Sequence, residues 1–293
     1  MRFSPGLLAL LAALLMAGCD AAQPSEPGTL VVEAFFRAGQ PLDTLTLRQT
    51  LPPEGSGPSA APGADVRLTL GGEDVPYREA APGRYVPSPG EERAAQPGTP
   101  FVLAVNWSGR QATAEGRIPP VIQIDTARVR APGKPVSTVL VDSLRLDSLD
   151  VPAEQGYIYP IEVELVWQAP AEASELKGGR WIQTRLRPSN PFSSRVIDFF
   201  LQPEATFRER TAATGAGRKR RWEGVYAVPA DSATAPLPPH RLRVGLVRAD
   251  SAYARFARTR GAPNQRDPDG NVRGALGIAS GVAVDRRTLQ IGD

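Results

Sequence analysis

Short stretches of alternating apolar and polar residues, separated by turn residues, recur along this chain and restrict it to a strand-rich fold. Between residues 65 and 70, valine or leucine occupies every second position, and aspartate, arginine and threonine fill the others. This period of two is typical of a strand with one buried face. The 293 residues include 30 prolines and 28 glycines, which favour many turns and few long helices. We therefore predict an all-β protein.

Residues 29–118 are predicted to form the first folded domain. Alternating segments follow one another at short intervals, from Leu30–Phe36 to Gln111–Ile118, and Gly71-Gly72 is typical of a hairpin turn between two of them. About seven short strands in a stretch of this length match an immunoglobulin-like β-sandwich. Pro119-Pro120 marks the predicted end of this domain.

Residues 119–293 are predicted to form a second, antiparallel β-rich domain. Apolar residues from Ile161 to Trp167 alternate with Glu162 and Glu164, as in a sheet with one face in water. Further strands are expected, including one at Val196–Leu201. One short helix is expected, with Asp250 or Ser251 as its cap and an apolar face formed by Tyr253, Phe256 and Ala257.

The only cysteine of the chain lies directly after a short apolar run. Residues 7–16 are apolar and are followed by Ala17-Gly18-Cys19. The run is shorter than the roughly 20 apolar residues that a membrane-spanning helix needs, and small residues at its end are typical of a secretory signal. The cysteine resembles the acylated residue of the bacterial lipobox. We predict a signal peptide at residues 1–18, lipid attachment at Cys19 and a flexible tether at residues 19–28.

The residue types that most enzymes use for covalent or metal chemistry are scarce. His240 is the only histidine, and the mature chain has no cysteine beyond the predicted lipid-bearing Cys19, which excludes the usual zinc ligand sets and a cysteine–histidine pair. The sequence has no nucleophile elbow, phosphate-binding loop or dinucleotide fingerprint. Asp267, Asp269 and Asn271 surround Gly270 as in a turn, and the spacing does not fit a calcium loop. We predict no catalytic residue, no metal site and no cofactor.

Two groups of charged residues leave alternatives open. Asp142, Asp147 and Asp150 suit the wet face of a strand, although paired carboxylates in the second domain would also suit a glycosidase-like hydrolase. A basic run precedes a tryptophan, and arginine with tryptophan is typical of partner-binding hot spots. The alternative for this run is a solvated loop entering a strand. The candidate partner-binding residues are Arg218, Lys219, Arg220, Arg221 and Trp222.

The net charge gives no support to a nucleic-acid partner. The formal charge of +3 includes Arg2, the only charged residue among residues 1–18, so the chain after the predicted signal carries 3 − 1 = +2. This value is close to neutral. We therefore predict no nucleic-acid binding. The predicted membrane contact is made through the lipid anchor at Cys19.

The order of several short motifs resembles one known family over essentially the whole mature chain. The motifs are Leu30-Val31-Val32-Glu33, Gly63–Leu68, Gly83-Arg84-Tyr85, Pro100–Val105, Gly270-Asn271-Val272, Gly274–Gly277 and Arg287–Ile291. Together they resemble domain-of-unknown-function family 4249, lipoproteins whose genes often lie beside those of TonB-dependent receptors. The resemblance implies an outer-membrane lipoprotein that assists a transporter, and it transfers no catalytic residue.

From the residues and the resemblance together, we expect a lipid-anchored binding or assembly protein of the outer membrane, accessory to a TonB-dependent receptor, and not an enzyme. The carboxylate-dependent hydrolase is one alternative. A structural or adhesion protein of the envelope is another.

Overall fold

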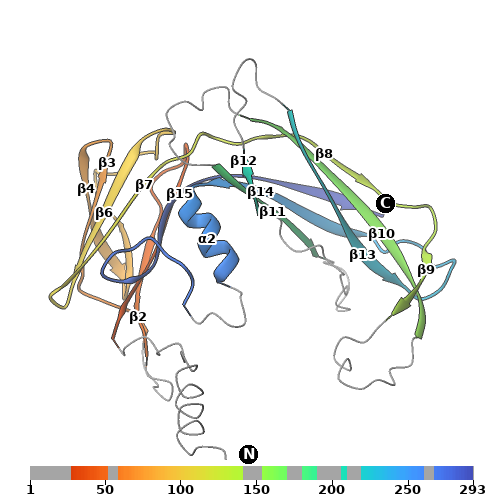
Figure 1. The fold of residues 1–293 in the computed structure, drawn as a ribbon, viewed down its shortest axis with the longest axis horizontal. Coiled ribbons are helices and arrows are strands. Elements are labelled where there is room, and N and C mark those ends of the chain that lie inside the picture. The colour runs from red at the N-terminus through yellow and green to blue at the C-terminus, as the bar shows by residue number, and fades with distance from the viewer. Residues whose placement is uncertain are drawn as a thin grey trace, which may run out of the picture.

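The structure is a computed structural model that describes residues 28–51, 59–140, 154–169, 180–189, 206–209, 219–260 and 267–292. Within these ranges the chain forms two β-sheets and one short helix, so the prediction of an all-β fold is confirmed (Figure 1). Several predicted features lie outside the described residues: the signal peptide, Cys19, most of the tether, the aspartates at positions 142, 147 and 150, the strand expected at Val196–Leu201, and Arg218.

The strands of both sheets pair in an antiparallel manner, except for one parallel pair. The larger sheet has eleven described strands in the order β12 (Thr206–Glu209), β11 (Arg180–Ser189), β14 (His240–Ala249), β15 (Leu276–Ile291), β1 (Leu30–Arg37), β2 (Leu45–Gln49), β5 (Arg84–Pro87), β4 (Glu73–Ala81), β3 (Asp65–Leu70), β6 (Pro100–Trp107) and β7 (Arg110–Arg117). The smaller sheet contains β13 (Lys219–Ala230), β10 (Glu154–Gln168) and β8 (Ile124–Arg130), with β9 (Val136–Leu140) also paired to β10. The parallel pair is β1 with β15.

The alternating sequence pattern gives each strand one apolar face, and these faces meet in a common core. On β3, Val66, Leu68 and Leu70 are buried while Asp65 and Arg67 are exposed. The core includes residues from both sheets, among them Ile161, Val163, Leu165 and Trp167 of β10, Tyr226 and Val228 of β13, and Leu242, Val244 and Leu246 of β14. Burial of this apolar area is the main favourable term that holds the two sheets together.

The one described helix, α2 (Ser251–Thr259), forms where the sequence predicts it. Asp250 is its N-cap, and its carboxylate accepts a hydrogen bond of 2.9 Å from the amide of Tyr253. The rings of Tyr253 and Phe35 meet edge to face at 6.1 Å, so α2 covers the side of β1 that faces away from the main core. No helix in the described ranges is long and apolar enough to cross a membrane.

The larger sheet continues across the domain boundary expected at residues 118 and 119. The first strand pairs with the last over seven positions, from Val31 opposite Leu276 to Arg37 opposite Val282. The strands of residues 29–118 all lie side by side within this one sheet, so the division between two facing sheets that defines an immunoglobulin-like sandwich is not confirmed. The alternating pattern predicts strands but not which strands pair, so it did not determine whether these strands form one sheet or two.

The segment before β15 joins the N-terminal strands to the C-terminal ones a second time. Thr113 of β7 and Arg273 exchange two backbone hydrogen bonds, of 2.8 and 2.9 Å. The side chain of Asn271 donates to the carbonyls of Glu115 and Ala279 and accepts from the amide of Ala279. The N-terminal strands therefore curl until β7 reaches the chain that leads into β15.

Candidate functional site

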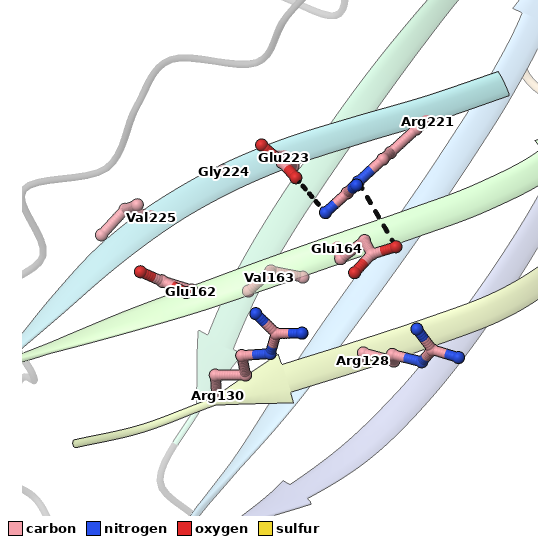
Figure 2. A pocket seen from close by; sticks show the side chains of 9 residues that line it. All are labelled: Arg128, Arg130, Glu162, Val163, Glu164, Arg221, Glu223, Gly224 and Val225. Carbon is pink, nitrogen blue, oxygen red and sulfur yellow. Dashed lines mark ion pairs between the residues drawn. The ribbon is translucent and has the colours of Figure 1, made fainter.

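A shallow groove on the outer face of the smaller sheet gathers charged side chains from three strands (Figure 2). Its cavity volume is about 180 Å³. The residues that line it are Arg128 and Arg130 of β8, Glu162, Val163 and Glu164 of β10, and Arg221, Glu223, Gly224 and Val225 of β13. The charged residues lie here because the alternate positions of the same strands face the apolar core.

The pairing register places charges of opposite sign side by side across β8 and β10. Arg130 is opposite Glu162, and Arg128 is opposite Glu164. On β13, the guanidinium of Arg221 forms an ion pair of 3.4 Å with Glu164 and a second ion pair with Glu223. Glu164 is the most enclosed of these three, with its side chain 14% exposed. Arg221 of β13 therefore neutralises part of the negative charge of Glu164 and Glu223 on its side of the groove.

The described part of the predicted basic run lies within β13 rather than in a loop. Its four residues are paired with Leu165–Gln168 of β10. Successive side chains of a strand point to opposite faces, so the run does not form one patch. Lys219 and Arg221 are exposed, whereas Arg220 and Trp222 on the alternate positions are half-buried.

Trp222 belongs to the core side of β13. It packs against the main apolar core, and its indole ring lies over Gly224, where an added methyl group would overlap the ring. The area of this ring is therefore used for packing. Whether the run binds a partner stays a prediction, and in this arrangement Arg221 is the member that lines the groove.

His240 occupies a buried and fully bonded position between the two sheets. It is 2% exposed, and its Nδ1 lies 2.7 Å from the carbonyl oxygen of Pro238, which only accepts. Its Nδ1 therefore carries the proton, and Nε2 accepts a hydrogen bond of 2.6 Å from the hydroxyl of Tyr226. Burial raises the pKa of Tyr226, which keeps this hydroxyl protonated. The hydrogen bond between His240 and Tyr226 joins β14 to β13.

A second hollow, of about 290 Å³, lies where the start of α2 meets β7 and the segment around Asn271. Burial raises the pKa of Asp250, while hydrogen bonds from Tyr253 and Ser280 act in the opposite direction. This carboxylate accepts a hydrogen bond from the amide of Tyr253, as the cap of α2, and a second one of 3.3 Å from the hydroxyl of Ser280. It therefore serves to join α2 to β15.

The turn around Gly270 has a structural use. Asn271 bridges β7 and β15, and the amide of Asp269 donates to the hydroxyl of Thr259 at the end of α2. Among the described residues, no group of three or more histidine, cysteine, aspartate or glutamate side chains has a metal-binding arrangement. The segment thus connects three elements of the fold.

Two features of the structure were not predicted from the sequence. Glu162 and Glu164 were expected to face water, but no pattern indicated that β8 would place Arg128 and Arg130 beside them. Arg248 was not expected in the interior, and yet it is 1% exposed. The available signal was that Arg248 directly follows the apolar run Val244–Val247, because a buried arginine must find acceptors for its donors.

The comparisons with known proteins identify a family. No curated protein and no solved structure matches the chain. A family model described as "Domain of unknown function (DUF4249)" matches residues 20–288. This match covers nearly all of the chain and agrees with the resemblance carried by its strand and glycine motifs. The protein therefore belongs to the DUF4249 family.

Proposed function

We propose that this protein is a lipid-anchored binding or assembly protein of the cell envelope. In this proposal Cys19 carries the lipid at the outer membrane, residues 19–28 hold the folded part away from the bilayer, and the partner is a TonB-dependent receptor. The protein acts by contact and carries out no reaction.

The position of the single cysteine carries the proposal. Cys19 follows a short apolar run and two small residues, and the family match begins at the next residue, so the run lies outside the family domain. The first strand begins at Leu30, which leaves room for a short tether. Confinement to a surface raises the effective concentration of a weakly binding protein near a membrane neighbour, so modest contacts are sufficient.

Replacing the lipid-bearing residue tests the anchor. We expect Cys19→Ser to abolish incorporation of radiolabelled palmitate and to move the protein from the detergent phase to the aqueous phase, because serine provides no thiol for thioether formation. Ser25→Ala in the tether is the matched control and should keep both properties. Unchanged labelling and partitioning of the Cys19→Ser protein would contradict the lipid anchor.

Affinity capture from detergent-solubilised envelopes tests the partner. We expect the lipidated protein to co-purify with a TonB-dependent receptor, and we expect recovery of this receptor to fall when Cys19→Ser removes the protein from the membrane surface. Mass spectrometry of the captured material provides the measurement. Recovery of the lipidated protein alone, together with degradation of a polysaccharide by the purified material, would instead support the hydrolase.

A further inference from the structure

The charges of the groove on β8, β10 and β13 are balanced overall but separated in space. The lining includes three arginines and three glutamates. Arg221 is engaged by Glu164 and Glu223, as the dashed lines in Figure 2 show. Among the described residues, Arg128, Arg130 and Glu162 form no ion pair. The groove therefore presents two available cations along β8 and one available anion beside them on β10.

The spacing of these groups sets the size of a matching ligand. Arg130 lies directly opposite Glu162 in the β8–β10 register, so the arginines of β8 and this carboxylate of β10 extend from neighbouring strands. Arg128 and Arg130 are two positions apart on one strand and face the same side, which allows both guanidinium groups to contact one tetrahedral anion. A small ligand with an anion and a cation a few atoms apart satisfies the arginines and the carboxylate together.

The lining also distinguishes between kinds of cationic group. Proteins bind quaternary ammonium groups in cages of aromatic rings. None of the described residues that line the groove is aromatic. The glutamates of β10 instead offer carboxylate oxygens, which accept hydrogen bonds from a primary ammonium. The cavity of about 180 Å³ suits a headgroup-sized molecule rather than a long chain.

We propose that this groove binds a phosphoethanolamine group, with the phosphate between Arg128 and Arg130 and the primary ammonium at Glu162. Glu164 borders the ammonium position, and Arg221 holds the Glu164 carboxylate in place. The assignment goes beyond the proposed function. It does not depend on the lipid anchor, since a free compound in solution tests it.

Calorimetric titration of the full lipidated protein in maltoside micelles tests the site, with free O-phosphoethanolamine as the probe at low ionic strength. We expect inorganic phosphate and phosphocholine each to bind about tenfold more weakly, which is the effect of losing one charge-assisted hydrogen bond. Equal affinity for phosphoethanolamine and phosphocholine, or no binding of either, would overturn the proposal.

Three variants separate the two halves of the site. We expect Glu162→Gln to weaken phosphoethanolamine binding about tenfold and not to weaken phosphate binding, because it removes the ammonium contact and also a negative charge opposite Arg130. Arg130→Gln should weaken the binding of both compounds. Arg67→Gln, at an exposed position on β3, is the matched control and should change neither. Wild-type affinity of the Glu162→Gln protein for phosphoethanolamine would refute the site.

Nanodiscs distinguish the two possible sources of the phosphoethanolamine group, which are the headgroup of a bilayer lipid and a soluble ester. If the source is a bilayer lipid, discs of phosphatidylethanolamine occupy the groove and lower the apparent affinity for the free compound relative to discs of phosphatidylcholine. Equal affinity in both discs assigns the site to a soluble phosphoethanolamine ester. Both results support binding of a phosphoethanolamine group in the groove, and loss of binding of the free compound in phosphatidylcholine discs would overturn it.

Discussion

Gly277→Ala is expected to lower the free energy of unfolding by about 3–5 kcal/mol, because strained backbone and forced overlap add together at this position. The φ angle of Gly277 is +102°, a region that residues with a Cβ rarely adopt. A methyl group here would overlap the carbonyl oxygen of Val32 and stand 2.8 Å from its amide nitrogen. Backbone atoms of a paired strand cannot move aside without loss of the β1–β15 pairing.

Gly133→Ala provides the matched control for this measurement. Gly133 lies between β8 and β9, has no neighbouring atom within 4 Å of an added Cβ and does not have a left-handed φ. Its substitution should leave the urea unfolding midpoint unchanged or raise the unfolding free energy by about 0.5 kcal/mol, through the unfolded state. An equally small effect for Gly277→Ala would show that β1 and β15 do not pair in this register.

The strands themselves could be predicted from the sequence, but their pairing could not. The alternation in β3 and β10 correctly indicated which side chains face the core, and the helix is capped by Asp250, one of the two residues that the sequence allowed. Nothing in the pattern of β1 indicated that it lies beside β15, because a period of two describes the faces of a strand and not its neighbours. Gly277 was recognised only as part of a family motif. The reason why a glycine is needed there, the close backbone of Val32 on the paired strand, is visible only in the structure.

The candidate site was predictable to a similar degree. The basic run before Trp222 was recognised, but its placement on β13 divides it between two faces, which composition alone cannot reveal. The groove depends on Arg128 and Arg130, which come from a strand far from Arg221 in the sequence. Such a site exists only after the register of β8, β10 and β13 has been fixed.

Arg248 joins the linker between β7 and β8 to the rest of the fold through hydrogen bonds. Its guanidinium donates hydrogen bonds to the carbonyl oxygens of Val121 at 2.6 Å, Pro120 at 3.3 Å and Gln168 at 3.4 Å. One side chain on β14 thus connects the chain leading into β8 with the end of β10. Because the side chain is 1% exposed, water does not readily replace it as the donor.

Arg248→Met is expected to lower the free energy of unfolding by about 2 kcal/mol, since it keeps an unbranched, mostly apolar side chain but leaves three partly buried carbonyls without this donor. Arg248→Lys keeps the charge and should lose less, because its compact ammonium reaches fewer of these carbonyls than a planar guanidinium does. Urea unfolding measures both changes, and Arg67→Met on exposed β3 should change stability by less than about 0.5 kcal/mol. Hydrogen exchange adds a local readout: the amides of residues 121–124 should exchange faster in Arg248→Met than in Arg67→Met. Equal protection in the two variants would show that Arg248 does not hold this linker.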